Sequence, residues 1–203
     1  EASVKQILKA AVKHKISYLD TAQNYGNSEE VIGRCKPINH NFKIISKLNL
    51  PRENQISEKD INNLEENFKK TLIDLKSESI NSFLVHDSKY LKYRNSEILF
   101  NWLKSLKNRK LIENIGISIY DLEELNEICL DNINLIQIPI SIYNQHATRL
   151  KYLEKLSQEG FLIHARSCFL QGLLLQSYKA WPRYISENLI NHHARTEKIR
   201  SEE

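Results

Sequence analysis

Short apolar runs recur along the chain, and each is followed by a stretch whose apolar residues are spaced three and four positions apart. An apolar run of four to eight residues, bounded by polar or turn-forming residues, predicts a buried strand. The chain contains six such runs. The predicted strands cover residues 16–20, 42–47, 82–86, 114–118, 135–138 and 161–165.

The stretches between these runs have the periodicity of amphipathic helices. The clearest follows Ser57, a residue type that caps helices, and places its apolar side chains on one face. These side chains are Ile61, Leu64, Phe68, Leu72 and Leu75. Further helices are predicted over 4–12, 28–34, 96–106, 122–128 and 150–156, and the polar tail from 178 onward is also predicted to be helical.

Strict alternation of strands and helices predicts right-handed crossovers and a parallel sheet, and therefore an α/β fold. Both a barrel and an open sheet satisfy this pattern. A barrel is favoured because polar residues follow the C-terminal ends of different strands, where barrels of this class carry their active groups. An open doubly wound sheet typically has a G-x-G-x-x-G loop after its first strand, and the sequence has none. The polar strand-end residues are Asp20, Lys47, His86, Ser118 and Gln137.

Composition narrows the class of protein further. The 203 residues are 41% hydrophobic and 27% charged, which fits one well-buried globular domain. The net charge of +4 comes without a basic stripe and interleaved aromatics, so we expect no nucleic-acid partner. Three cysteines without C-x-x-C spacing, and no apolar run approaching about 18 residues, predict a cytoplasmic protein without a membrane span.

One segment carries an extended motif, D-T-A-x-x-Y-G-x-S-E-x-x-x-G, which begins at Asp20 and ends at Gly33. The motif strongly resembles the signature of the aldo/keto reductase family. Similar segments follow in the family's order over most of the chain from residue 16 to about 175. They include Lys47, Leu84-Val85-His86, Gly116-Ile117-Ser118, Gln137, and Ala165-Arg166-Ser167 through Gly172.

The resemblance implies a (β/α)8 barrel, of which only about six strands are recognisable here. We therefore expect a single aldo/keto reductase-like domain over residues 1–203, without one strand at each end of the complete barrel. The missing strands would precede Glu1 and follow Glu203. An open barrel of this kind would leave strand edges unpaired and prone to aggregation.

The resemblance also implies a catalytic tetrad of Asp20, Tyr25, Lys47 and His86. Tyr25 would be the general acid, and Lys47 would lower the pKa of its phenol from the ordinary value of roughly 10. Asp20 would keep Lys47 charged despite its burial, and His86 would orient the carbonyl oxygen. Taken singly, each of these residues also has an ordinary structural explanation, such as a turn, a packing contact or a solvated charge. Their order and their placement at successive strand ends favour the tetrad.

The cofactor side matches the family less completely. Ser118 and Gln137 correspond to residues that hold the nicotinamide carboxamide, but Ile119 stands where the family usually has Asn. Arg166, followed by Ser167, stands where an aromatic residue often stacks on the nicotinamide. A guanidinium plane can stack on a ring, yet its charge opposes the positive charge of the oxidised cofactor, which predicts a preference for the reduced form. The alternative interpretation of Arg166 is a salt bridge at the barrel rim. The family leads us to expect NADPH, with NADH remaining open.

The remaining candidates are weaker. His146 and His192-His193 lack metal-ligand spacing with nearby Cys or acidic residues, so we expect no metal. Cys35 and Cys168 have no activating partner in the sequence and are read as packing residues. The leading hypothesis is an NAD(P)H-dependent oxidoreductase that reduces a small aldehyde or ketone to an alcohol. The alternative is a barrel of the same family that binds a cofactor or partner without turnover.

Overall fold

The computed structural model describes residues 2–35, 38–50, 54–146, 151–182 and 184–202. Six parallel strands form one sheet whose order in space is the order in the chain. This confirms the predicted incomplete barrel, because a doubly wound sheet would reverse its strand order. The strands are β1 (Tyr18–Asp20), β2 (Lys43–Leu48), β3 (Ile80–Val85), β4 (Ile112–Ser118), β5 (Leu135–Pro139) and β6 (Leu162–Arg166).

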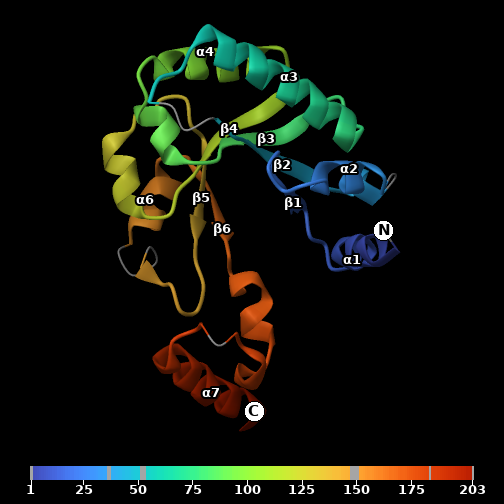
Figure 1. Ribbon diagram of the computed structural model, residues 1–203, viewed down its shortest axis with the longest axis vertical. Helices are drawn as coiled ribbons and strands as arrows, with labels where there is room; N and C mark the ends of the chain where they lie inside the picture. Colours follow the sequence, from blue (N-terminus) through green and yellow to red (C-terminus); the bar gives the residue numbers. More distant parts are fainter. Residues whose placement is uncertain (1, 36–37, 51–53, 147–150, 183, 203) are drawn as a thin grey trace.

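Helices alternate with the strands, and those between the first and the last strand cover the outer face of the sheet (Figure 1). The sheet curls into a half-barrel, so that β1 approaches β5 and β6 across the concave side. A ring contact between Tyr18 and His164, 4.8 Å between centroids, marks this approach. The α-helices are α1 (Ala2–Lys13), α2 (Ser28–Gly33), α3 (Glu58–Leu75), α4 (Ser96–Asn108), α6 (Tyr152–Gln158) and α7 (Glu187–Glu202). Short 3-10 helices are η1 (Ile38–Asn41), η2 (Ser88–Lys92), η3 (Leu122–Glu127), η4 (Leu170–Leu175) and η5 (Tyr178–Ala180).

Helix α3 shows how the sequence pattern becomes structure. Ser57 begins it with a capping box, in which the Ser57 side chain and Asp60 satisfy each other's backbone amides. The residues it buries are spaced four, three and four positions apart, so they form one stripe against the sheet. Lys76 ends the helix in a left-handed conformation. The buried stripe consists of Leu64, Phe68, Thr71 and Leu75.

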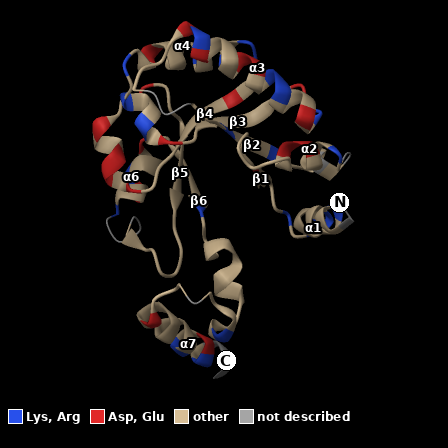
Figure 2. Ribbon diagram, in the orientation of Figure 1, with Lys and Arg blue, Asp and Glu red and all other residues tan. Residues whose placement is uncertain are grey.

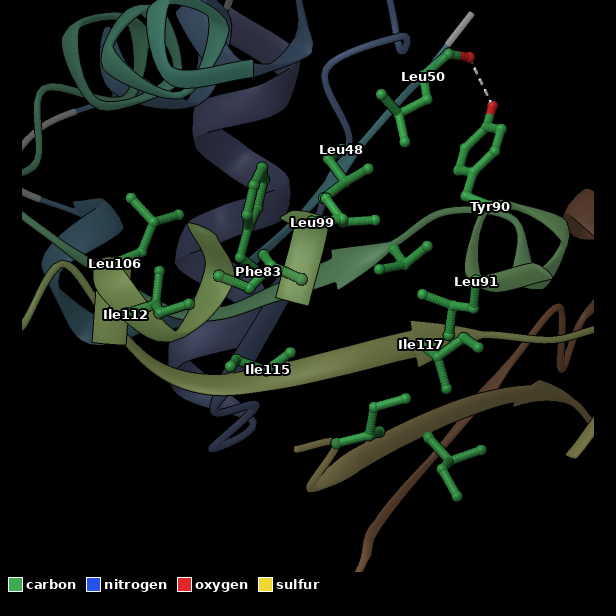
Figure 3. Packing of buried hydrophobic residues seen from close by; sticks show 14 of the residues in the cluster. Leu48, Leu50, Phe83, Tyr90, Leu91, Leu99, Leu106, Ile112, Ile115 and Ile117 are labelled. Atoms are coloured by element: carbon green, nitrogen blue, oxygen red, sulfur yellow. Dashed lines mark hydrogen bonds between the residues drawn. The ribbon is translucent and has the colours of Figure 1, made fainter. Parts of the chain in front are cut away.

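The main hydrophobic core lies between the sheet and these helices. Figure 3 shows Phe83 of β3 and Ile115 of β4 facing Leu99 and Leu106 of α4. Charged residues gather on α3, α4, α6 and α7, while the strands are mostly uncharged (Figure 2). Burial of one face of α2, α3, α4 and α6 therefore holds the outer layer on the sheet. No described helix combines the length and the apolarity that crossing a membrane requires.

The C-terminal segment, with η4, η5 and α7, extends away from the sheet (Figure 1). Its buried residue His193 stacks on Trp181 at 4.4 Å between ring centroids. His193 Nε2 lies 3.0 Å from the Gln176 carbonyl oxygen, which can only accept, so Nε2 is the donor. The other ring nitrogen, Nδ1, is hydrogen-bonded to the Tyr143 hydroxyl, 2.8 Å away. This contact ties α7 to the segment after β5.

Candidate active site

The polar residues at the strand ends share the concave face of the half-barrel. A small apolar cluster of Ile45, Leu84 and Leu135, with Tyr18 against it, lies on that face. Side chains alternate between the faces of a strand, so a residue two positions further on points the same way. This spacing places a polar residue beyond each member of the cluster, at the same end of the sheet. The pairs are Tyr18 and Asp20, Ile45 and Lys47, Leu84 and His86, and Leu135 and Gln137.

Lys47 is the centre of this arrangement. It is only 1% exposed, and its Nζ donates to Asp20 Oδ2 at 2.7 Å and to the Thr21 carbonyl at 2.9 Å. Burial lowers the pKa of Lys47, and the Asp20 carboxylate acts in the opposite direction. The second oxygen of Asp20 accepts from Gln137 Nε2 at 3.0 Å, across the interior of the half-barrel. Asp20 therefore links a lysine on β2 to a glutamine on β5.

Tyr25 lies in the loop between β1 and α2, and its ring faces both Lys47 and His86. Lys47 Nζ is 5.1 Å from the Tyr25 ring centroid, and the His86 ring is edge-on at 5.8 Å between centroids. The structure thus brings together Asp20, Tyr25, Lys47 and His86. Tyr25 remains 47% exposed, so its hydroxyl can be reached from solvent.

The electrostatics of Tyr25 differ from the sequence prediction. The pKa of Tyr25 is raised from its ordinary value, first by burial and second by the Asp20 carboxylate. The prediction that the pKa of Tyr25 is lowered is therefore wrong, because burial and the Asp20 carboxylate together raise it. The cation that does lower the pKa of Tyr25 is Arg166.

His86 follows β3 and is half-buried. Burial lowers its pKa from the ordinary value of 6.5, and the cations Lys47 and Arg166 lower it further. The imidazole is therefore neutral near pH 7 and can donate one N–H to an oxygen placed beside Tyr25.

The two residues predicted to hold a carboxamide lie side by side. Ser118 on β4 and Gln137 on β5 are partners in the strand register, and both are buried. While Gln137 Nε2 donates to Asp20, Gln137 Oε1 is buried and has no hydrogen-bond partner in the described part of the chain. A free buried acceptor is costly to leave unpaired. The NH2 group of a nicotinamide carboxamide is a donor of the required kind, so these residues fit the cofactor.

Arg166 ends β6 and reaches over the same mouth. Its Nη2 donates to the Ile119 carbonyl at 3.0 Å, and its guanidinium lies 4.6 Å from the Tyr120 ring centroid. Ser167 Oγ is a weaker contact at 3.4 Å, and Ser167 itself has a left-handed backbone (φ 57°). Among the residues described, no ion pair joins Arg166 to a carboxylate. The structure therefore does not show the salt bridge at the rim that was the alternative interpretation of Arg166. The Ile119 side chain packs in the main core.

A cavity of about 690 Å³ opens beside His86. Its walls are largely polar, and Tyr120 forms part of them, so the cavity joins His86 to the ring on which Arg166 rests. We refer to it as the rim cavity. It is lined by Asn24, Asn49, Leu50, Asn54, His86, Asp87, Lys89, Tyr90, Tyr93 and Tyr120.

Sequence reasoning missed two features of this region. The first is Tyr120, which no motif singled out. The second is a solvent-exposed group of Asp121, Glu123 and His146, whose potential ligand atoms all lie within 4.8 Å of one another. His146 lies 3.6 Å from Glu123 Oε1 and 3.9 Å from Asp121 Oδ1. Folding brings His146 to these acids from a distant segment, so local spacing could not reveal the group.

The chain matches the model of the Aldo/keto reductase family over residues 1–198. Comparison with curated proteins gives no match. Similar solved structures include an aldo-keto reductase from Bacillus halodurans in its holo form, with 21% identity, a TM-score of 0.69, and coverage of 90% of this chain and 62% of that chain.

The glycerol dehydrogenase from Gluconobacter oxydans has 21% identity and a TM-score of 0.64, with coverage of 90% of this chain and 57% of that one. An aldo/keto reductase from Klebsiella pneumoniae in complex with NADP and acetate has 19% identity and a TM-score of 0.63, with coverage of 89% and 65%. The chain thus spans 57–65% of the lengths of these structures. At these identities the structural likeness shows the fold alone.

Proposed function

The chain belongs to the aldo/keto reductase family, and we propose that it reduces an aldehyde or ketone to an alcohol with NADPH as the reductant. The observation that carries the proposal is the convergence of Tyr25, His86 and the Lys47–Asp20 ion pair at one mouth of the half-barrel. A phenol, an imidazole and a buried cation are the groups that a developing alkoxide requires.

Tyr25 acts as the general acid in this mechanism. Its raised pKa keeps the proton on the hydroxyl near neutral pH, so the acid is in its active form when a carbonyl arrives. As the carbonyl oxygen gains negative charge, Tyr25 Oη transfers its proton to that oxygen, and the carbonyl becomes an alcohol. The positive charge of Arg166 favours the phenolate that remains.

His86 sets the direction of the carbonyl oxygen. Because the pKa of His86 is lowered, the ring is neutral and donates a hydrogen bond without supplying the proton itself. Its position against the edge of Tyr25 places the donor beside the hydroxyl that transfers the proton. The rim cavity on its other side holds the remainder of the substrate.

Ser118, Gln137, Arg166 and Ser167 are the residues that would hold the nicotinamide. Gln137 Oε1 is the free acceptor for the carboxamide, and Ser118 is its partner in the strand register. When bound, NADPH supplies the hydride that reduces the carbonyl carbon. The complex of the Klebsiella pneumoniae relative with NADP supports the choice of NADPH.

The substitution Tyr25→Phe tests the proposal. It removes the proton that the alkoxide needs, so carbonyl reduction should fall at least 100-fold, within the usual range for a lost general acid. Binding of NADPH, followed by its fluorescence, should change little. Tyr184→Phe is the matched control, because Tyr184 is 84% exposed and has no role in the proposed mechanism, and this variant should reduce carbonyls at the parent rate. Undiminished turnover by Tyr25→Phe would remove Tyr25 from the mechanism.

The second candidate function is cofactor binding without turnover, as in a regulatory protein. It is favoured by Ile119, whose side chain packs in the core and cannot hold a carboxamide. Fluorescence titration with NADPH, combined with reductase assays on a panel of aldehydes and ketones, separates the two. Tight binding without oxidation of NADPH by any carbonyl would support the binding protein.

A further inference from the structure

Glu29 is a buried carboxylate that the proposed chemistry does not use. It lies on α2, four residues beyond Tyr25, and is 7% exposed. An ionised carboxylate is expensive to bury unless hydrogen bonds satisfy its oxygens. Burial accordingly raises the pKa of Glu29, while hydrogen bonds from Ser46 and Thr71 act in the opposite direction.

Those hydrogen bonds connect four parts of the fold. Ser46 Oγ on β2 donates to Glu29 Oε1 at 2.6 Å, and Thr71 Oγ1 on α3 donates to Glu29 Oε2 at 3.1 Å. Gln23, in the loop before Tyr25, donates from Nε2 to Thr71 Oγ1 at 3.1 Å. The carboxylate of α2 is thus joined to a strand, a second helix and the loop that carries Tyr25.

The connections reach both members of the Tyr25–Lys47 contact. Ser46 immediately precedes Lys47, and Gln23 lies two residues before Tyr25. The ends of the loop are also joined, because the hydroxyls of Thr21 and Ser28 lie 2.6 Å apart. A displacement of the loop from β2 would therefore break the hydrogen bonds around Glu29.

We propose that Glu29 is a positioning residue that holds the Tyr25 loop against β2, so that the phenol stays over Lys47 and beside His86. The effect of Glu29 on catalysis rests on the proposed reductase function. Its effect on the order of the Tyr25 loop does not depend on that function. A purely architectural role would stabilise the fold as a whole without controlling the loop. Local order of the loop distinguishes these possibilities.

The chain offers a matched control for this distinction. Glu65 on α3 is another carboxylate between two elements: it accepts from Trp102 Nε1 at 2.9 Å and from Arg109 at 2.8 and 3.1 Å, and so joins α3 to α4. It has no contact with the Tyr25 loop among the hydrogen bonds of the described residues. Glu65→Gln should therefore loosen an interface remote from the mouth.

The first test is amide hydrogen exchange over residues 22–28 in the parent chain, Glu29→Ala, Glu29→Gln and Glu65→Gln. We expect exchange in this loop to become about tenfold faster in Glu29→Ala, since about 1.4 kcal/mol of local stability corresponds to that factor. Glu29→Gln should be intermediate, because its amide retains one acceptor. Glu65→Gln should leave the loop at the parent rate. Parent-like exchange in the folded Glu29→Ala variant would overturn the proposal.

The second test is kinetic and uses the same variants. Misplacement of the acid should lower kcat about 10- to 100-fold in Glu29→Ala, with NADPH binding unchanged and with partial rescue by Glu29→Gln. If Glu29→Ala fails to fold, Ser46→Ala takes its place, because it removes one hydrogen-bond donor and leaves the carboxylate. Faster amide exchange of the loop in Ser46→Ala would support the positioning role of Glu29, and parent-like exchange would overturn it. A parent chain that reduces no carbonyl would refute the reductase function, and the exchange result would still decide the role of Glu29.

Discussion

Lys47 and Asp20 form an ion pair whose two members lie in different environments. The Lys47 side chain is 1% exposed and the Asp20 side chain is 40% exposed, with 2.7 Å between Nζ and Oδ2. The ammonium group is therefore removed from water, while its counter-charge stays hydrated. This arrangement keeps a buried cation next to Tyr25 without burying two charges at once.

Removing the carboxylate should reveal how much the buried ammonium depends on it. Asp20→Asn leaves Lys47 with the Thr21 carbonyl but no opposite charge, and it should destabilise the fold by about 2 kcal/mol, less than for a fully buried pair. Chemical denaturation measures this change. Glu127→Gln, which breaks the exposed pair with Lys92, is the control and should leave the midpoint almost unchanged. Equal destabilisation by the two substitutions would show that the Lys47–Asp20 pair contributes no more to stability than an exposed ion pair.

Because the pKa of His86 is lowered in the folded chain, we expect acid to destabilise the fold at a higher pH than the range in which ordinary carboxylates titrate. The unfolded chain binds a proton near pH 6.5, but the folded chain resists it, so the free energy of unfolding should fall as the pH drops below about 6.5. The contribution of neutral His86 to the free energy of unfolding is fully present above that pH. His86→Gln should flatten the dependence of the unfolding free energy on pH between about 7 and 5. His164, whose pKa burial also lowers, keeps its own contribution in both chains, so an unchanged slope would show that His86 contributes none.

Arg166 should set the preference between the two redox states of the cofactor. A guanidinium beside the nicotinamide opposes the positive ring of the oxidised form and leaves the reduced form unaffected. Arg166→Met should therefore improve binding of NADP+ relative to NADPH by about tenfold, equivalent to about 1.4 kcal/mol. Arg166→Lys, which retains the charge, is the control. Fluorescence titration with NADPH and with NADP+ gives the ratio of the two dissociation constants. Equal ratios in the parent chain, Arg166→Met and Arg166→Lys would place Arg166 away from the nicotinamide ring.

Gly33, the last residue of the motif, permits the close approach of α2 to α3. A Cβ at this position would lie 1.9 Å from the Asp74 carbonyl oxygen, and the obstacle is backbone. Gly33→Ala should therefore destabilise the fold by about 3 kcal/mol, at the upper end for overpacking. Gly26 has open space around it but a φ of +60°, so Gly26→Ala should cost only about 1 kcal/mol. Thermal unfolding of the two variants tests this order.

The secondary structure was largely predictable because the apolar periodicity is strong. The predicted strand over 135–138 corresponds to Leu135–Pro139, and that over 114–118 lies within Ile112–Ser118. The first strand was predicted too long, since residues 16 and 17 precede the observed Tyr18–Asp20. The helix predicted over 122–128 is a short 3-10 helix, although Asp121 caps it as expected.

The neighbours of each candidate residue were less predictable than the residues themselves. The position of Lys47 follows from its strand, but its hydrogen bonds to Asp20 and the Thr21 carbonyl do not follow from the sequence. The raised pKa of Tyr25 was equally hidden, because it depends on burial and on the distance to the Asp20 carboxylate in the folded chain. Likewise, Arg166 was recognised as an unusual residue, whereas its contact with Tyr120 depends on how two strand ends meet.

The sequence by itself determined the alternation of strands and helices, and with it the parallel sheet and the end of the sheet where polar residues gather. These properties are local, because apolar spacing along a few residues decides which face of an element is buried. Only the tertiary structure decided the link between Asp20 and Gln137, the hydrogen bonds around Glu29 and the meeting of His146 with Asp121 and Glu123. Such contacts join residues far apart in the chain, and the curl of the sheet and the packing of its helices set their distances.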